Sequence, residues 1–291
     1  TTPKLIKSHA NAHKMTIPSV ACKQDGATFV TGSWDATAKI WENGSVKATL
    51  QGHTDWIRRV AMSSDGQLVA TASDDHLVKV WDANTGTVKH TLEGHSRGVW
   101  AVDFSPDTKL LASGGDDRTI ILWDVATGQR LRTCEGHADA VNMVSFAPDG
   151  TSLASAGAER HIRTWDPNTC QTTQTFYGHL NQVLSVHWSR DGKELVSASA
   201  DATVKVWSRN GRELKSMGTW LEGWYREARF TSDGNHLVTV GDDKVVKVWQ
   251  KSGVLKTSLP GHTNWALSVC LCRDNTAVSV GDDRSIHVWQ V

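Results

Sequence analysis

The chain lacks a long hydrophobic run and lacks an excess of either charge. No stretch of about 18 apolar residues occurs in its sequence, so we expect no membrane-spanning segment, and no signal peptide is visible. Lysine and arginine together number 31, and so do aspartate and glutamate. A net charge of zero removes the long-range field that draws a protein onto nucleic acid or anionic lipid. The sequence therefore predicts neither a nucleic-acid partner nor a membrane partner.

Cysteine is also scarce. The 5 cysteines are odd in number and show no metal-type spacing, and Cys270 and Cys272 lie two apart in an apolar stretch. Buried, reduced thiols are the expected state. Such thiols favour a cytoplasmic location, with a nuclear one as the alternative. No metal ion or other cofactor is expected, because no His or Cys cluster with metal spacing is visible. The chain begins at Thr1 rather than at a Met, which leaves open that it is a piece of a longer protein.

Tryptophan, in contrast, is abundant and recurs at a fixed period. Of 14 tryptophans, seven follow one another at intervals of 40 or 42 residues. A constant period of this length indicates one structural unit that is stacked repeatedly. The seven markers are Trp41, Trp81, Trp123, Trp165, Trp207, Trp249 and Trp289.

Each period contains short apolar runs separated by turn signals. The runs are rich in β-branched residues and too short for helices, as in the segment 78–81, so they predict strands. Pairs such as Asp65-Gly66 and Asn43-Gly44 separate the runs and favour tight hairpins. Three hairpins per period predict one twisted, four-stranded antiparallel sheet.

A single sheet of this kind cannot bury both of its faces, so neighbouring sheets must stack. A ring leaves fewer exposed edges than an open row, and seven units predict an all-β, seven-bladed β-propeller. The last unit stops at Val291 after its third strand, while a strand-like piece at residues 4–7 precedes the first unit. We predict that this N-terminal piece closes the ring as the fourth strand of the last blade. The closing strand is expected within residues 1–12, and the repeats at approximately 13–50, 51–92, 93–134, 135–176, 177–217, 218–259 and 260–291.

Two short motifs carry a family resemblance. A Gly-His pair opens five units, at His53, His95, His137, His179 and His262, and a Trp-Asp pair closes three units, at Trp81, Trp123 and Trp165. In these motifs the chain resembles the WD-repeat family throughout its length. The resemblance implies a non-catalytic scaffold for protein–protein interaction.

The resemblance further implies a repeated hydrogen-bonded network of a His, a hydroxyl, an acid and the marker Trp. A buried network is stable when every polar group has a partner. The five complete sets are His13, Thr31, Asp35 and Trp41; His53, Thr71, Asp75 and Trp81; His95, Ser113, Asp117 and Trp123; His179, Ser197, Asp201 and Trp207; and His262, Ser279, Asp283 and Trp289. Two units depart from the pattern: Glu159 joins His137, Ser155 and Trp165 in the fourth, and Leu221 takes the His position beside Thr239, Asp243 and Trp249 in the sixth.

A set of Ser, His and Asp also suggests a hydrolase triad. A catalytic nucleophile must face a cavity beside an oxyanion hole. These hydroxyls instead fall inside predicted strands and recur in every unit. We therefore expect a structural role for the network and no enzymatic activity.

The resemblance also implies which residues line the narrow top face of the ring. They lie three and five residues after the His position and directly before the acid. The second of these groups comprises Pro18, Arg58, Trp100, Asn142, Leu184, Arg226 and Leu267. The other two groups bring tryptophans to blades that become neighbours when the ring closes. An exposed arc of indoles predicts a binding surface, since Trp and Arg are common hot spots; packing of each indole under a loop is the alternative.

Acidic residues are expected on the same face. Indoles ringed by carboxylates suit a partner segment that bears Lys or Arg, although the acids can also serve only as turn caps. The predicted docking set is Trp34, Trp56, Arg58, Trp100, Trp224, Arg226, Trp265, Asp74, Asp116, Asp242 and Asp282.

Four functions are open from the sequence alone. The first is an interaction scaffold, a monomeric propeller within a larger protein or complex. The second is a ligand-sensing or autoinhibitory domain of a larger nucleotide-binding signalling protein, because near-identical repeats resemble the arrays attached to such proteins. An enzyme is disfavoured by the missing metal or paired-carboxylate cluster, and a nucleic-acid binder by the zero net charge.

Overall fold

The structure is a computed structural model that describes residues 2–291, and it folds into a ring of seven four-stranded antiparallel sheets. Blade one contains β2 (Ser19–Cys22), β3 (Thr28–Gly32), β4 (Ala38–Glu42) and β5 (Ser45–Leu50). Blade two contains β6 (Ile57–Met62), β7 (Leu68–Ser73), β8 (Val78–Asp82) and β9 (Val88–Leu92). Blade three contains β10 (Val99–Phe104), β11 (Leu110–Gly115), β12 (Ile120–Asp124) and β13 (Arg130–Cys134). Blade four contains β14 (Val141–Phe146), β15 (Leu153–Gly157), β16 (Ile162–Trp165) and β17 (Thr172–Phe176).

The remaining blades follow the same order. Blade five contains β18 (Val183–Trp188), β19 (Glu194–Ser199), β20 (Val204–Ser208) and β21 (Glu213–Met217). Blade six contains β22 (Tyr225–Phe230), β23 (His236–Gly241), β24 (Val245–Gln250) and β25 (Leu255–Pro260). Blade seven contains β26 (Ala266–Leu271), β27 (Thr276–Gly281), β28 (Ile286–Gln290) and, from the other end of the chain, β1 (Lys4–His9). One short helix, η1 (Trp220–Glu222), precedes blade six, and no helix in residues 2–291 is long enough to cross a membrane.

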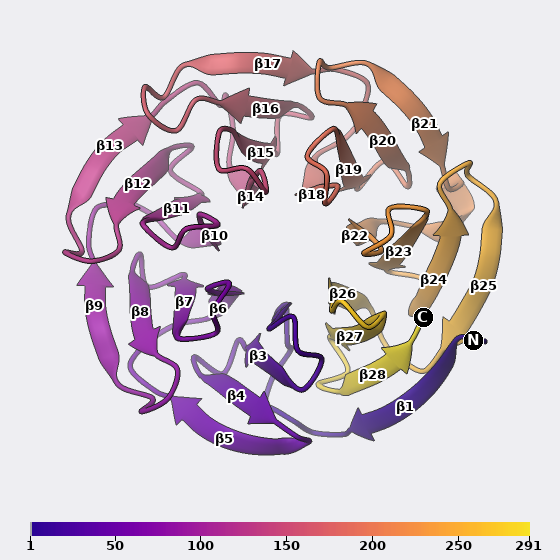
Figure 1. Cartoon of the computed structure of the whole chain (residues 1–291), viewed down its shortest axis with the longest axis horizontal. Coiled ribbons are helices and arrows are strands. Elements are labelled where there is room, and N and C mark those ends of the chain that lie inside the picture. The colour runs from indigo at the N-terminus through magenta and orange to yellow at the C-terminus, as the bar shows by residue number, and fades with distance from the viewer. Residues whose placement is uncertain (1) are drawn as a thin grey trace.

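The ring closes by pairing its two ends. Strand β1 lies antiparallel to β28, with Lys4 opposite Gln290 and His9 opposite Ile286. Figure 1 shows the sheets arranged radially around a central channel, with β1 completing the rim of the last blade beside β28. The seven blades and the closure by the N-terminal strand are therefore confirmed.

The hairpin turns explain why the sequence breaks where it does. Gly66 and Gly44 have φ of 72° and 83°, which is the left-handed region that L side chains rarely adopt. These glycines follow Asp65 and Asn43, as the predicted hairpins require. The turn residues thus cut each repeat into strands of four to six residues.

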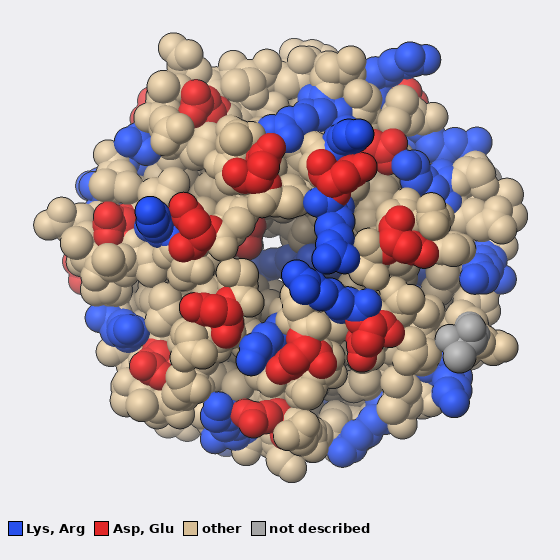
Figure 2. All heavy atoms as spheres, viewed as in Figure 1, with Lys and Arg blue, Asp and Glu red and all other residues tan. Residues whose placement is uncertain are grey.

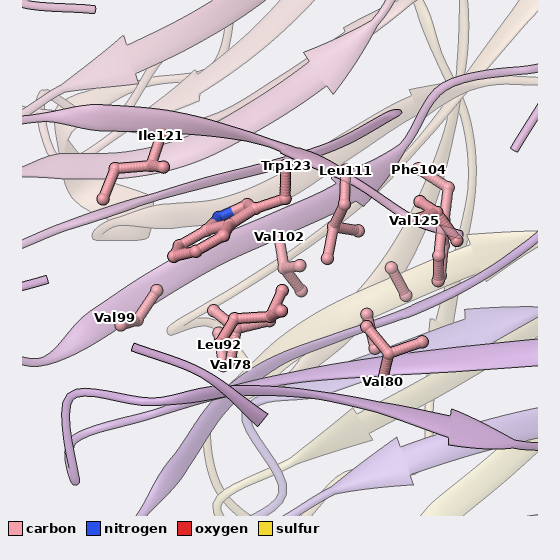
Figure 3. Close-up of a cluster of buried hydrophobic side chains, with 13 residues drawn as sticks. Val78, Val80, Leu92, Val99, Val102, Phe104, Leu111, Ile121, Trp123 and Val125 are labelled. Carbon is pink, nitrogen blue, oxygen red and sulfur yellow. The ribbon is translucent and has the colours of Figure 1, made fainter. Parts of the chain in front are cut away.

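The hydrophobic core is divided among the interfaces between neighbouring blades. Between blades two and three, Val80 and Leu92 on one sheet pack against Val102, Leu111 and Trp123 on the next, as Figure 3 shows. Equivalent clusters fill the other six interfaces of the described chain, including that between blades one and seven. Each blade therefore buries both faces only because it has a neighbour on each side.

The cysteines correct one expectation. Cys22 on β2 forms a disulfide with Cys270 on β26, and Cys134 on β13 forms one with Cys170 in the turn before β17. Among the described residues Cys272 is the one free thiol, and its burial raises its pKa to about 12. The prediction of reduced thiols is wrong for the other four, because stacking brings together cysteines of neighbouring blades, one and seven in the first bond and three and four in the second. Reduced thiols therefore no longer support the expected cytoplasmic location.

Charges on the surface are mixed rather than segregated. Figure 2 shows acidic and basic side chains interspersed around the channel opening on the face in view. This distribution agrees with the zero net charge of the chain. On that face, no single sign of charge covers a broad area.

The disulfide between Cys22 and Cys270 joins the first blade to the last, across the seam of the ring. We expect C22A to unfold about 2–4 kcal/mol more easily than the wild type in non-reducing buffer, because the cross-link restricts the unfolded chain. Urea unfolding followed by tryptophan fluorescence measures this difference. The matched control is C272A, which removes the free thiol and is expected to change stability less. Equal stability of C22A and the wild type would contradict the role given to this bond.

Candidate functional site

The repeated network of polar side chains is the framework that holds the loops of the top face. In the five complete sets, His Nδ1 lies 2.7–3.0 Å from the aspartate and His Nε2 lies 2.6–2.8 Å from the hydroxyl. The indole Nε1–H of the marker Trp donates to the same hydroxyl oxygen at 2.8–3.0 Å. The hydroxyl therefore accepts from the indole and donates to the imidazole, whose other nitrogen donates to the carboxylate.

The hydroxyl residues of the network have no contact with solvent. Each lies in the second strand of its blade, at 0% exposure, and accepts from the indole of its own blade. The seven are Thr31, Thr71, Ser113, Ser155, Ser197, Thr239 and Ser279. A side chain without exposed surface cannot touch a partner or a substrate. The hydroxyl position therefore belongs to the framework of the site and not to its binding surface.

In the five complete sets the pKa of the aspartate is lowered, because the contact with the histidine outweighs the effect of burial. In blade three, burial alone raises the pKa of Asp117, but the hydrogen bond and charge of His95 lower it to about 2. Ser113 of the same set is buried and already accepts from Trp123. Such a hydroxyl does not fit the exposed nucleophile of a hydrolase triad.

In the six blades that carry aspartate at the acid position, the carboxylate also accepts a backbone N–H of the following turn. Asp75 contacts His53 through one oxygen and accepts the backbone N–H of Leu77 through the other. His76 lies between Asp75 and Leu77 in the sequence and has a φ of 74°, a conformation that L residues rarely adopt. The carboxylate of Asp75 therefore stabilises this turn.

Blade four shows what glutamate does at this position. Glu159 bonds to His137 through Oε1, but its Oε2 is buried without a hydrogen-bond partner among the described residues. The longer side chain thus keeps the imidazole contact and loses the contact with the turn.

Blade six replaces the missing imidazole by a different cluster. Leu221 is 74% exposed, and the ring of Tyr225 lies at 6.5 Å from that of Trp249, edge to face. Lys247 forms ion pairs with Asp243 at 2.7 Å and with Glu222 at 3.0 Å, and the Tyr225 hydroxyl donates to Glu222. Asp243 therefore pairs with a lysine, a partner that the repeat pattern does not predict.

On the top face, Arg58 organises three of the predicted indoles. Its guanidinium carbon lies 5.0 Å from the ring centre of Trp56, 5.5 Å from that of Trp100 and 5.9 Å from that of Trp34. Trp34 and Trp56 are stacked at 3.9 Å with an interplanar angle of 5°. Asp74 accepts two hydrogen bonds from Arg58, at 3.0 and 2.9 Å, which fixes the plane of the guanidinium.

A second cluster repeats this arrangement across the channel. The guanidinium carbon of Arg226 lies 4.6 Å from the ring centre of Trp224 and 4.8 Å from that of Trp265. Asp242 accepts from Arg226 at 2.7 and 3.2 Å. Trp265 and Trp224 are the more open indoles, with 45% and 36% of their surface exposed. Each cluster is an Arg–Asp pair with indoles against the guanidinium, an arrangement that stabilises the cation.

The two clusters border one cavity of about 420 Å³, which we call the tryptophan cavity. All seven residues that lie five positions after the His position line it. The lining residues are Pro18, Trp34, Arg58, Arg59, Trp100, Asn142, Met143, Gln182, Leu184, Trp224, Arg226, Trp265, Leu267 and Asp282. Seven members of the predicted docking set thus meet at one place.

The other four members lie outside the lining. Trp56, Asp74 and Asp242 are one contact away, because they hold Trp34, Arg58 and Arg226 respectively. Asp116 is not brought to the cavity, and its nearest cation is Arg97 at 3.7 Å.

Arg59, Glu227 and His187 form a group of charged and polar side chains beneath the tryptophan cavity, which we call the charged floor. None of these residues belongs to the predicted docking set. Arg59 of blade two reaches across the channel to Glu227 of blade six at 2.8 Å, and His187 lies 2.6 Å from the same carboxylate. Arg59 lines both the tryptophan cavity and a second cavity of about 160 Å³, so this ion pair lies between them. The aligned repeats do indicate this ion pair. Arg59 and Glu227 are charged at a strand position where the other blades carry Ser, Ala or Met.

The floor contains further buried ionisable groups. Burial raises the pKa of Asp103 to about 6 and lowers that of His187 to about 4. Glu227 remains ionised, since the positive charges of Arg59 and Arg229 outweigh its desolvation and keep its pKa well below the usual value.

These observations define a class of protein, a closed seven-bladed propeller with an indole-lined cavity at the centre of one face. The family described as WD domain, G-beta repeat, matches residues 4–42, 44–82, 86–124, 128–166, 170–208, 223–250 and 253–290. These segments cover most of the chain, which therefore belongs to the WD-repeat family. Members of this family generally serve as protein-interaction scaffolds.

Two relatives each match one or two repeats of the chain. The chain is 48% identical over 42 residues to the phospholipase A-2-activating protein of Xenopus laevis, which is 14% of this chain and 5% of that protein. It is 45% identical over 58 residues to the pre-mRNA-splicing factor PRP46 of Candida albicans, which is 19% of this chain and 15% of that protein. Such short matches reflect the shared repeat.

The network predicts the effect of removing one imidazole. We expect H95L to lower the free energy of unfolding by about 1–3 kcal/mol, because Ser113 and Asp117 lose a buried partner. The control is H90L on the outer strand of the neighbouring blade two, where His90 makes no side-chain hydrogen bond with the described residues. A melting temperature of H95L equal to that of H90L would show that the network does not stabilise the fold.

Glutamate at the acid position predicts an opposite effect. We expect E159D to raise the free energy of unfolding by about 1 kcal/mol, because a shorter carboxylate can bond to both His137 and the turn. The reverse exchange in blade three, D117E, is expected to lower it by a similar amount. Urea unfolding of both variants tests the pair, and the idea fails if the two changes have the same sign.

Proposed function

We propose that the protein docks a segment of a partner protein on its top face by receiving a large apolar or aromatic side chain of that segment in the tryptophan cavity. The observation that carries the proposal is the convergence of indoles from blades one, three, six and seven on a single cavity. Proline, leucine and methionine complete the apolar part of the lining. A concave, mostly apolar site with a few placed polar groups is the usual form of a binding pocket.

The Arg–Asp pairs support a site that is ordered before the partner arrives. Each indole is held against a guanidinium, and each guanidinium donates two hydrogen bonds to a carboxylate. Fixed aromatic side chains lose little conformational entropy on binding, so they favour affinity.

The same pairs bear on the charge of the partner. If only the acids of this face are considered, they predict a partner segment that bears Lys or Arg. Asp74 and Asp242 are engaged by Arg58 and Arg226, and these arginines also cover faces of the indoles. Asp282 is the carboxylate of the lining, and uncharged side chains hold it. An incoming cation would meet three lining arginines, which favours an apolar anchor.

Selection of peptides from a random library tests the proposal. We expect the wild type to enrich peptides with one conserved large apolar residue, and W265A to bind them at least about tenfold more weakly. The matched control is W220A, because Trp220 is 81% exposed and lies outside the cavity lining. Fluorescence anisotropy of a labelled peptide gives the affinities.

Two outcomes would contradict the proposal. Enrichment of Lys- or Arg-rich peptides that lack an apolar anchor would show that the site binds a cationic segment. Equal affinity of W265A and W220A would place docking elsewhere on the protein.

A further inference from the structure

Blade seven carries a histidine at a strand position where most blades carry a cation, two residues before the marker Trp. The residues at this position in blades one to seven are Lys39, Lys79, Ile121, Arg163, Lys205, Lys247 and His287. Five blades therefore carry a cation there, whereas blade seven carries an imidazole. His287 is buried at 8% exposure, and its neighbours are the His and the acid of the local network.

The imidazole of His287 completes a cluster of three metal-ligating side chains. His262 Nδ1 lies 2.9 Å from an oxygen of Asp283, and one ligand atom from each of His262, Asp283 and His287 lies within 4.8 Å of the others. The two imidazole rings meet edge to face at 4.5 Å. Ser285 Oγ lies between them, 3.4 Å from His262 Nδ1 and 3.2 Å from His287 Nε2.

The outer nitrogens of both imidazoles are already oriented. His287 Nδ1 lies 2.6 Å from Ser8 Oγ on β1, and His262 Nε2 lies 2.8 Å from Ser279 Oγ. Metal-ligating histidines commonly bond to an oxygen through the nitrogen that does not bind the metal. His287 Nε2 and His262 Nδ1 are thus the atoms directed toward Asp283.

In two blades of the described chain the acid of the network also pairs with the cation that lies two residues before the marker Trp. In blade six the equivalent lysine, Lys247, lies 2.7 Å from Asp243, and in blade four Arg163 lies 3.9 Å from Glu159. No Lys or Arg of the described chain forms an ion pair with Asp283. Asp283 thus pairs with His262 alone, as the acids of blades one, two, three and five pair with their own histidines, and the residue that sets blade seven apart is His287.

We propose that His262, Asp283 and His287 form a binding site for a divalent metal ion of the Zn²⁺ type. Two imidazoles and one carboxylate suit Zn²⁺ better than Mg²⁺ or Ca²⁺, which prefer oxygen ligands. Zinc binds such atoms at about 2.0–2.2 Å, which requires the three ligand atoms to draw together. Ser285 Oγ or a water molecule supplies a fourth ligand. When the ion binds His262 Nδ1, the imidazole adopts the tautomer with its proton on Nε2, which donates to Ser279 Oγ, so the imidazole stays neutral.

Metal titration of the whole chain tests the site. After treatment with a chelator, we expect one equivalent of Zn²⁺ to raise the melting temperature of the wild type. One equivalent of Co²⁺ should give the visible absorption bands of a tetrahedral ion. The key variant is H287K, which installs the residue that four other blades carry and so preserves the fold. We expect it to bind Zn²⁺ at least about tenfold more weakly and to lose the Co²⁺ bands.

A second variant separates this site from adsorption of metal by other histidines. H90K removes a histidine on the outer strand of blade two and is expected to respond to Zn²⁺ as the wild type does. The proposal is overturned if H287K and the wild type gain the same melting temperature from Zn²⁺. It is also overturned if the wild type shows no tetrahedral Co²⁺ spectrum, a result that does not depend on the folding of any variant.

Discussion

Closure of the ring is the constraint on which the rest of the structure depends. Each core cluster is shared by two blades, so no blade is complete without a neighbour on each side. The pairing of β1 with β28 gives the seventh blade its fourth strand and holds it against the first. The disulfide between Cys22 and Cys270 joins the inner strands of the same two blades. Hydrogen bonding and a covalent bond therefore secure one seam at the rim and near the channel.

The closed ring is also what assembles the tryptophan cavity. Trp224 and Trp265 come from blades six and seven, and Trp34 comes from blade one. These indoles are far apart in sequence and meet only across the seam. The Arg–Asp pairs then fix the indoles in place, while Arg59 and Glu227 join opposite sides of the channel beneath them. Packing between blades, the Arg–Asp pairs and the charged floor thus all hold the indoles of the tryptophan cavity in position.

Much of this arrangement follows from periodicity, and the remainder depends on contacts between repeats. The marker tryptophans predict the number of blades, and the lack of a fourth strand in the last unit predicts the closure, because both follow from comparing the repeats with one another. The cation–indole contacts of Arg58 involve three blades, so no single repeat reveals them. The disulfide of Cys22 has the same origin, since its partner is 248 residues away. The spacing around His287 gives no metal motif, although its departure from lysine is visible in the aligned repeats.

The direction of the closing strand has a mechanical consequence. Because β1 and β28 are antiparallel, Lys4 at the start of the chain lies opposite Gln290 at its end. A force that pulls the two ends apart would load the hydrogen bonds of this pair one after another, as in a zipper, rather than all at once in shear. The rim of the seam would then open at low tension. The bond between Cys22 and Cys270 would hold the inner strands of blades one and seven together after β1 had been peeled away.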